Sequence, residues 1–372
     1  MKIAIITDQK PSFRMPMGIG LNRMLTKIGV ESTLFFDEEI SQTVYTKVEK
    51  LVIGFKNFVK KIINKVGLKK YEIIELHSNQ SLLKQLSGFN AVIVVAHLPT
   101  SLSKKHFSYV EEIRSKIKLP ILNYDLCFWS TRGDWCERVI NEPQWGGFTG
   151  FDRFDWYLAV SNISEFPQNK NIEWPVTVVG GSFENTELYP DQNHVFKVLI
   201  DFERPKYSDE RKLQLEVLNE LNIPYTILEG EYDYSVLCSI YRQHSAYFLA
   251  HRESFGLPIV EVQNCGSYIF TPYKNWAPSH YINKAVSDSG EGDLSGNFIV
   301  YDNQKDKLAK ELMRIKNEFN ASVVIETFTA SHPHLRCGDL EKLKLVSSMI
   351  KDGRINSLTH LDNKGIGKYI IK

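Results

Sequence analysis

Short apolar runs alternate with amphipathic stretches along the chain, and this order predicts a fold of the α/β class. Ten apolar runs predict buried strands, at 2–7, 30–36, 91–96, 119–123, 156–161, 196–200, 225–228, 246–250, 268–271 and 298–300. Helical periodicity follows several of them, at 213–221, 234–244, 305–319 and 340–350. Continuous apolar strands separated by helices are typical of parallel sheets that are covered on both faces.

The stretch from 246 to 266 predicts a strand, a tight loop and a helix. Residues 246–250 are apolar, 251–256 are charged and end in glycine, and Leu257-Pro258 opens an apolar helix. Proline costs little at an early helical position, because its missing N–H would have no partner there. Glu253 therefore stands on the loop, and Glu261 stands in the first turns of the helix.

The start of this helix has the chemistry of a nucleotide-sugar site. The amides of Phe255, Gly256 and Leu257 would point unpaired out of the helix start, where the helix dipole favours an anion such as phosphate. Glu253 and Glu261 flank these amides as hydrogen-bond acceptors for hydroxyl groups. Taken alone, the two carboxylates are explained more simply as a loop ion pair and a helix-terminal acid.

Two other strand ends carry candidate ligand-binding residues. The strand at 2–7 is followed by a loop with Gly18 and Gly20, where glycines would let a phosphate or sugar approach the backbone, although they are as often structural. The strand at 91–96 delivers His97 to its carboxyl end, where ligands bind in open parallel sheets. A histidine there is also common as a local hydrogen-bonding residue.

An aromatic stretch follows the strand at 119–123 and Asp125. It spans 127–150 and contains Trp129, Arg132 and Trp135. Aromatic faces among polar groups bind sugar rings, and they also pack irregular loops together. Binding of a sugar ring and internal packing both remain open for this stretch.

The segment 46–70 predicts a basic amphipathic helix. Apolar residues recur with a period near 3.6 over five turns, and lysines crowd the remaining positions. Such a helix can lie in an anionic membrane interface, or it can pack its apolar stripe on the protein with the lysines solvated.

Composition narrows the class of protein. The chain has 372 residues, which suggests two domains, and 45 Lys and Arg balance 44 Asp and Glu. This balance gives no reason to expect a nucleic-acid partner. Five cysteines without a C-x-x-C pair favour a reducing compartment, and no signal peptide or membrane-spanning run is apparent. We therefore expect a cytoplasmic protein, with peripheral contact at the inner face of the membrane if the segment 46–70 binds lipid.

The segment from Glu253 to Glu261, with Gly266 after it, resembles the signature E-G-F-G-L-P-x-x-E-A-x-x-x-G of retaining GT-B glycosyltransferases, specifically glycosyltransferase family 4. Ser254 replaces the usual Gly and Val262 the usual Ala. The resemblance covers nearly the entire chain and implies an α/β fold of two Rossmann-like domains, with parallel sheets facing each other across a cleft. Residues 1–190 would bind the acceptor and 191–372 the nucleotide sugar, and the last helix is a candidate for crossing back to the first domain.

The resemblance also implies a set of site residues. It places Glu253, Arg204, Lys206 and His97 in the catalytic centre, although the usual Lys-Gly is absent and Arg211 or Lys212 could replace Lys206. It places Gly18, Gly20, Glu229, Ser254, Phe255, Gly256, Leu257 and Glu261 around the donor. Asp125, Trp129, Arg132 and Trp135 are the acceptor-side candidates. Glu253 would bind the donor sugar, Glu261 the ribose, and Arg204 the diphosphate.

The implied reaction moves a sugar from a nucleotide-diphosphate donor to a hydroxyl of a glycan or lipid-linked acceptor, with retention at the anomeric carbon. The sequence has no D-x-D triplet and no cluster with metal-ligand spacing, so we expect no metal and no cofactor beyond the donor itself. Two alternatives are a nucleotide-sugar epimerase or hydrolase on the same fold, and a non-catalytic member that binds a glycan or nucleotide sugar.

Overall fold

The computed structural model describes fourteen parts of the chain, and the account below concerns these alone. They are residues 1–7, 14–36, 84–95, 113, 117–127, 154–161, 172–173, 176–184, 187–191, 195–253, 255–276, 278–282, 292–355 and 370–371. The amphipathic segment 46–70 lies outside the described residues, and the membrane contact expected of it stays a prediction.

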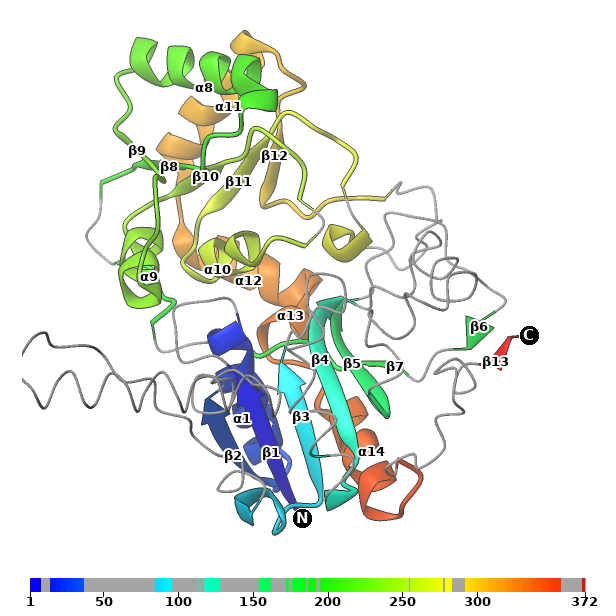
Figure 1. Ribbon diagram of the computed structural model, residues 1–372. Helices are drawn as coiled ribbons and strands as arrows, with labels where there is room; N and C mark the ends of the chain where they lie inside the picture. Colours follow the sequence, from blue (N-terminus) through cyan, green and yellow to red (C-terminus); the bar gives the residue numbers. More distant parts are fainter. Residues whose placement is uncertain are drawn as a thin grey trace, which may run out of the picture.

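The first sheet has six parallel strands in the order β2-β1-β3-β4-β5-β7 (Figure 1). Its strands are β1 (Lys2–Thr7), β2 (Glu31–Phe36), β3 (Ala91–Val95), β4 (Ile121–Cys127), β5 (Trp156–Ser161) and β7 (Val176–Val178). Every neighbouring pair is parallel, with Ile5 beside Leu34 on one side and Ile93 on the other. The central strands are buried on both faces, as their continuous apolar sequences predict.

The second sheet has five parallel strands in the order β12-β11-β10-β8-β9. Its strands are β8 (Val198–Ile200), β9 (Tyr225–Ile227), β10 (Ala246–Phe248), β11 (Tyr268–Thr271) and β12 (Phe298–Val300). The helices α8 (Ser208–Glu220), α9 (Tyr234–Arg242), α10 (Leu257–Asn264) and α11 (Lys305–Glu318) connect or follow these strands. Two apolar clusters, one on each face of the sheet, bury the inward side chains. A short antiparallel pair, β6 (Ile172–Glu173) with β13 (Ile370–Ile371), stands apart from both sheets.

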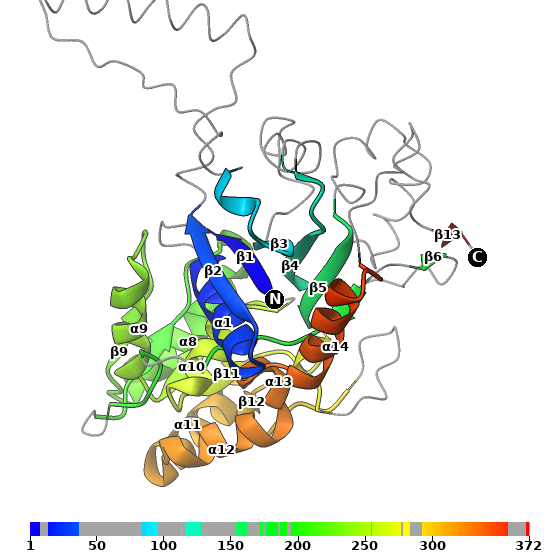
Figure 2. The same cartoon turned by 90° about the horizontal axis from the view of Figure 1, so that it is seen from below.

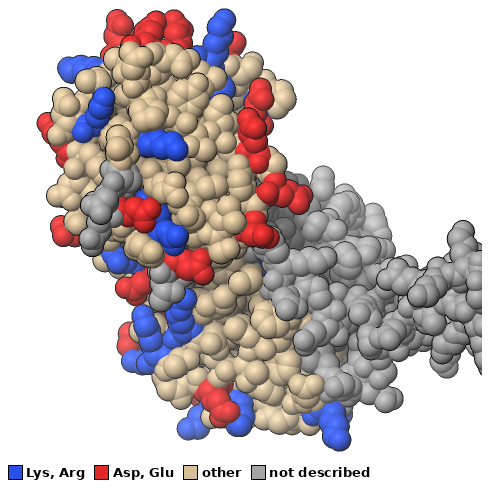
Figure 3. Space-filling model, turned by 90° about the vertical axis from the view of Figure 1, so that its left-hand side faces the viewer, with Lys and Arg blue, Asp and Glu red and all other residues tan. Residues whose placement is uncertain are grey.

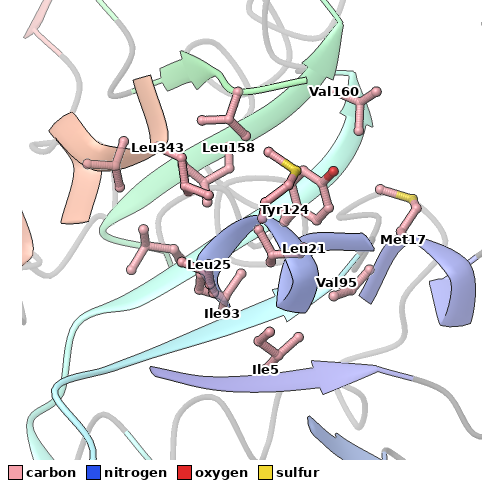
Figure 4. Close-up of a cluster of buried hydrophobic side chains, with 14 of the residues drawn as sticks. Ile5, Met17, Leu21, Leu25, Ile93, Val95, Tyr124, Leu158, Val160 and Leu343 are labelled. Atoms are coloured by element: carbon pink, nitrogen blue, oxygen red, sulfur yellow. The ribbon is translucent and has the colours of Figure 1, made fainter. Parts of the chain in front are cut away.

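Helix α1 (Arg14–Lys27) covers one face of the first sheet. Met17, Leu21 and Leu25 of this helix lie in one buried apolar cluster with Ile5 and Ile93 of the strands (Figure 4). The burial of each such side chain contributes about 1.5 to 3 kcal/mol. This amphipathic stripe fixes the helix on the sheet.

The expectation that Gly18 and Gly20 lie in a loop is wrong, because both are residues of α1. The physical reason is close packing. A Cβ on Gly20 would lie 2.5 Å from the backbone oxygen of Ser182, and one on Gly18 would lie 2.9 Å from Cβ of Thr7. Pro16 is tolerated in the first turn of the helix, where its missing N–H has no intrahelical partner.

The C-terminal helices return to the first sheet. They are α12 (Ala321–Ser331), α13 (Pro333–Arg336) and α14 (Leu340–Lys351). Helix α14 contacts α1 and β7, α13 contacts β5, and both α12 and α13 also contact α10 of the second sheet (Figure 2). The backbone of Gly181 donates to the His334 carbonyl at 2.8 Å. The domain boundary expected near Pro190 stays a prediction.

The two sheets share one buried apolar cluster. Phe255, Leu257 and Val260, which follow β10, lie in the same cluster as Met17 and Leu21 of α1. The carboxyl end of β10 therefore faces the first sheet, and the loop after it lies where the two halves of the molecule meet. Among the described helices, none has the length and apolar character required to span a lipid bilayer.

Candidate functional site

The polar residues of the candidate site lie at the ends of two adjacent strands of the second sheet. Strands β8 and β10 are paired in parallel, with Ile200 beside Phe248, so the segments that follow them begin side by side. Asp201 and Arg204 follow β8, and His251 and Glu253 follow β10. Parallel pairing thus joins residues that are about 50 positions apart in the sequence, at the sheet edge where ligands bind in α/β folds.

Arg204 and Glu253 form an ion pair at this edge. The Nη2 of Arg204 donates to Oε1 of Glu253 at 2.6 Å. Burial acts to raise the pKa of Glu253, but the hydrogen bond and charge of His251, together with Arg204, outweigh it and lower the pKa below its ordinary value. Glu253 is therefore an ionised hydrogen-bond acceptor at neutral pH.

His251 lies behind Glu253 and contacts two carboxylates. Its Nε2 is 2.6 Å from Oε1 of Glu253, and its Nδ1 faces Oδ2 of Asp201 at 3.2 Å, although that contact lacks hydrogen-bond alignment. The other oxygen of Asp201 accepts a hydrogen bond from the hydroxyl of Tyr247 at 2.9 Å. The sequence analysis assigned no role to His251, Asp201 or Tyr247. The only local signal was a histidine two residues before the first glutamate of the signature.

Glu261 has the opposite environment from Glu253. Its side chain is buried within α10, and its Oε1 accepts a hydrogen bond from the hydroxyl of Tyr234 at 3.0 Å. Burial raises its pKa to about 7, and the Tyr234 hydrogen bond opposes this shift only in part. Both glutamates of the signature follow β10, but only Glu253 is paired with an arginine among the described residues.

A left-handed residue turns the chain between the two glutamates. Gly256 precedes α10 with φ of 64°, and a Cβ there would lie 2.9 Å from Cδ1 of Ile259 and 3.1 Å from Cβ of Glu253. Glycine is the residue that adopts this conformation without strain. The side chains of Phe255 and Leu257 are buried, and the ring of Phe255 stacks on His280 with centroids 6.3 Å apart. This packing fixes the backbone at the start of the helix.

The cations after Arg204 have different environments. Lys206 is exposed, with its Nζ 5.5 Å from the ring centroid of Tyr207. Arg211 is buried and donates to the backbone oxygen of Asp201 at 2.8 Å. Lys212 is exposed on α8. Arg211 therefore supports the loop after β8, and Lys206 and Lys212 are the two solvent-accessible candidates.

Glu229 lies on the exposed loop between β9 and α9. Its backbone N–H donates to the hydroxyl of Tyr232 at 3.1 Å, and the ring of Tyr232 lies 6.4 Å from that of Phe202. The structure thus places this loop beside the segment that follows β8. Its expected contact with the donor stays a prediction.

The first sheet presents a buried carboxylate near its own carboxyl edge. Asp125 lies near the end of β4 and accepts a hydrogen bond from the Leu126 backbone at 2.7 Å. Burial raises its pKa to about 7, while that backbone bond and the charge of Arg14 act against the shift. The Nε of Arg14 donates to the carbonyl of Val95 at 2.7 Å, at the end of β3. Asp125 and Arg14 therefore lie at the edge that faces the second sheet.

Five of the expected site residues lie outside the described part of the chain: His97, Trp129, Arg132, Trp135 and Ser254. Their roles stay predictions. Within the described ranges, no group of three or more His, Cys, Asp or Glu side chains could hold a metal ion. Acidic and basic side chains are interspersed over the described part of the face shown in Figure 3.

Comparison with known proteins gives a structural likeness. No protein-family model matches the chain, and no curated protein matches it. Among solved structures, an alpha-glucosyltransferase in complex with UDP and a 13-mer DNA containing an HMU base has a TM-score of 0.51 at 11% identity, covering 94% of this chain and 99% of that one. A UDP-GlcNAc 2-epimerase from Neisseria meningitidis bound to UDP-GlcNAc has a TM-score of 0.47 at 10% identity, covering 94% and 100%.

These likenesses concern the fold. The chain consists of two α/β units, each built on a parallel sheet, and this is the architecture of the GT-B class. The fold class expected from the sequence is confirmed. At these identities the comparison does not extend to substrate or reaction.

Proposed function

We propose that this protein is a retaining glycosyltransferase that takes a sugar from a nucleotide-diphosphate donor to an acceptor hydroxyl. The observation that carries the proposal is the Arg204–Glu253 pair at the joined ends of β8 and β10, immediately before the left-handed turn at Gly256. A cation, an ionised carboxylate that accepts hydrogen bonds, and the start of a helix thus lie together at one sheet edge of a GT-B fold. The resemblance of the segment 253–261 to family 4 supports the same function.

The chemistry assigns a role to each group. In transfer, the bond between the anomeric carbon and the diphosphate oxygen breaks, and its electron pair passes to the diphosphate. The acceptor oxygen bonds to the anomeric carbon, and its proton passes to the departing diphosphate. Arg204 would balance this charge, because a guanidinium has five N–H donors and can contact phosphate while it still contacts Glu253. The amides of residues 255–257 at the start of α10 would add donors for the same anion. Lys206 or Lys212 would supply a second charge.

The two glutamates would bind hydroxyl groups of the donor. Glu253 is ionised and partly exposed, so it can accept hydrogen bonds from the sugar. Glu261 would accept from the ribose, with Tyr234 holding its carboxyl group. No described residue is assigned as a nucleophile.

The acceptor side would come from the first sheet. Asp125 lies at its carboxyl edge, and a glycan or a lipid-linked sugar is the acceptor class that we propose. A DNA acceptor belongs in the test, because the alpha-glucosyltransferase with a TM-score of 0.51 was solved with DNA.

The test is a donor screen of the full chain against UDP-, GDP- and dTDP-linked sugars. We expect one donor to raise the melting temperature and to release its nucleoside diphosphate when glycan, lipid-linked or DNA acceptors are added. Glu253→Gln should lower turnover by about 100- to 1000-fold, because a preorganised polar contact to the reacting group is lost. The anomeric proton coupling of the product, measured by NMR, should show retention.

The control is Glu318→Gln, which removes an exposed carboxylate from α11 in the same half of the molecule. This variant should match the wild type. Donor consumption that needs no acceptor and yields an isomerised sugar or a free sugar would identify an epimerase or a hydrolase instead. A folded protein that binds a donor without consuming it would identify a non-catalytic binding protein, and one that binds none of the donors would overturn the proposal.

A further inference from the structure

A chain of polar contacts runs behind Glu253 and connects β10 with the end of β8. It passes from the Tyr247 hydroxyl to Asp201 at 2.9 Å, from Asp201 to His251 at 3.2 Å, and from His251 to Glu253 at 2.6 Å. The side chains of Asp201 and His251 are 6% and 2% exposed, whereas that of Glu253 is 29% exposed. The chain therefore leads from the interior of the sheet to the exposed edge.

This arrangement needs an explanation beyond stability. Taking an ionisable pair out of water is costly, and apolar residues of similar volume are often as stable or more so. Yet the protein also uses Arg211 to hold the Asp201 backbone oxygen, and Gln214 to hold Arg211, both from α8. The surrounding strands are otherwise apolar. The protein therefore keeps these buried polar side chains although their removal from water lowers its stability.

We propose that Asp201 and His251 are positioning residues that hold Glu253 in the orientation needed to bind the donor sugar. This inference rests on the proposed function. Asp201 orients the imidazole ring through its 3.2 Å electrostatic contact with Nδ1, and the ring donates from Nε2 to Glu253, because a carboxylate can only accept. Asp201 thus acts on the donor through His251 and does not touch it.

The geometry also selects which oxygen of Glu253 serves the sugar. Both His251 and Arg204 contact Oε1, each at 2.6 Å. Within the described residues, no group donates a hydrogen bond to Oε2. We assign Oε2 to the donor sugar and Oε1 to the protein. A carboxylate held by two donors on one oxygen cannot rotate freely, so its second oxygen points in a fixed direction.

The groups that surround His251 come from four elements. Asp201 follows β8, Tyr247 lies in β10 behind Asp201, and Glu253 lies on the same loop as the ring. Tyr207, from the 3₁₀ helix η3 (Pro205–Tyr207), places its ring 5.8 Å from the imidazole. Arg204 reaches the site only through Glu253. The two carboxylates are thus the charged groups in contact with the ring.

The test compares Asp201→Asn and His251→Gln with His244→Gln. His244 is also a buried histidine, with Nδ1 2.6 Å from the Ile240 carbonyl, but it precedes β10 and lies at the opposite end of that strand. The probes are the UDP-, GDP- and dTDP-linked sugars of the donor screen, and the matching free nucleoside diphosphate. Melting temperatures establish that each variant is folded.

We expect Asp201→Asn to lower kcat by about 100-fold, because a small displacement of a positioning group is enough for such a loss. Affinity for the free nucleoside diphosphate, which has no sugar, should stay within about two-fold of the wild type. In His251→Gln the acid limb of the kcat/KM profile should move to higher pH, since Glu253 loses the charge that lowers its pKa. His251→Gln should also retain more activity than His251→Phe, which has no donor.

The outcomes separate the two proposals. If the wild type turns over a donor, but Asp201→Asn and His251→Gln match His244→Gln in kcat and in the pH profile, the positioning role is wrong and the proposed function stands. If the wild type turns over no donor, the proposed function fails and the positioning role fails with it.

Discussion

The carboxyl edges of the two sheets contain the same kinds of residue and give them opposite properties. At the first edge, Asp125 lies near Arg14 and its pKa is raised to about 7. At the second edge, Glu253 lies beside Arg204 and its pKa is lowered. Asp125 is buried and Glu253 is partly buried, and each has one arginine close to it.

The difference lies in the direct donors. Asp125 receives one backbone hydrogen bond on Oδ1, and its buried Oδ2 has no hydrogen-bond partner among the described residues, so burial dominates its pKa. Glu253 receives donors from both Arg204 and His251 on one oxygen, and these outweigh burial. An arginine in the neighbourhood is therefore not enough to keep a buried carboxylate ionised, whereas a contact at hydrogen-bond distance is. The second edge is built to present a fixed negative charge, and the first edge a carboxyl group that can exchange a proton near neutral pH.

The largest effect is expected when Arg204, a direct donor to Glu253, is removed. Arg204→Met should lower turnover of the donor found in the screen by about 100- to 1000-fold, since both the diphosphate and Glu253 lose their cation. The measurement is steady-state release of nucleoside diphosphate. Lys206→Met and Lys212→Met, measured beside it, will identify the second cation, and the loss should be smaller because neither lysine contacts Glu253.

The control for this series is Lys305→Met. Lys305 is an exposed lysine that contacts Glu216 and Glu220 on α8, away from the edge of the sheet. It should behave as the wild type. Equal losses in the Arg204 and Lys305 variants would show that the edge has no special need for a cation.

The second prediction concerns the opposite pKa shifts of Asp125 and Glu253. In the folded protein Asp125 ionises near pH 7, while in the unfolded chain it ionises near 3.8, so the wild type loses stability as pH rises from about 4 to 7. As pH rises over that range, the free energy of unfolding of Asp125→Asn should therefore increase by about 2 to 4 kcal/mol relative to that of the wild type, because one pKa unit corresponds to about 1.4 kcal/mol. Urea unfolding at pH 4 and pH 8 measures it.

Glu253→Gln should show the reverse slope. The lowered pKa of Glu253 contributes stability that is present above about pH 4.5 and is lost as pH falls through the folded value. The variant should thus be less stable than the wild type at pH 6, and the difference should shrink toward pH 3. Slopes of the same sign in both variants would contradict the comparison between the two edges.

The sequence was sufficient for ten of the eleven strands of the two parallel sheets, all but β7, and for the signature glutamates Glu253 and Glu261. Continuous apolar runs such as 91–95 and 268–271 leave few alternatives to a buried parallel strand, and the segment 253–261 combines a glycine, a proline and two carboxylates in a recognisable order. Local pattern and local structure coincide in these places. The strand–loop–helix expected around Glu253 is confirmed by β10 and α10.

The sequence was not sufficient where distant backbones meet. Asp201 and His251 are joined only because β8 and β10 are neighbours in the sheet, and no local pattern encodes that pairing. The sequence predicts a loop at Gly18 and Gly20 because glycines after a strand let a ligand approach the backbone, yet both lie in α1, and Gly20 meets the backbone of Ser182, more than 150 residues away. Helices α12 and α13 were not predicted, since their packing is shared between the two halves of the molecule.

A smaller effect is expected from the glycines of the two edges. Gly256→Ala should lower the free energy of unfolding by about 2 kcal/mol, because it combines a left-handed φ of 64° with a clash against Ile259 and Glu253. Gly230→Ala has the same left-handed strain, at φ of 71°, but nothing lies within 4 Å of its Cβ, so it should cost only about 1 kcal/mol. Urea unfolding of the two variants measures the difference, which is the cost of the contact alone.

Gly20, in helix α1 beside the first sheet, tests whether there is room for a Cβ without any change of backbone conformation. Gly20 lies in a regular helix, so its replacement by alanine adds no backbone strain and gains about 0.5 to 1 kcal/mol of helix propensity, which opposes the cost of the approach to the Ser182 oxygen. We expect a cost of about 1 to 3 kcal/mol, because a backbone atom cannot move aside as a side chain can. A neutral Gly20→Ala variant would show that α1 can shift on its sheet.

The smallest effect tests whether Glu261, which is buried in α10, follows the rule seen for Asp125. It is buried and has one neutral donor, the hydroxyl of Tyr234, and its pKa is raised to about 7. Tyr234→Phe should lower the free energy of unfolding by about 1 kcal/mol, the net value of one hydrogen bond. It should also raise the pKa of Glu261 further, because the one contact among the described residues that lowers this pKa is removed. Urea unfolding between pH 5 and pH 8 measures both effects.

The matched control is Tyr225→Phe, whose hydroxyl makes only an exposed contact of 3.4 Å with Asn219. If Tyr234→Phe matched this control at every pH, one neutral donor would have no influence on a buried carboxylate, and the contrast between the two edges would depend on charged donors alone.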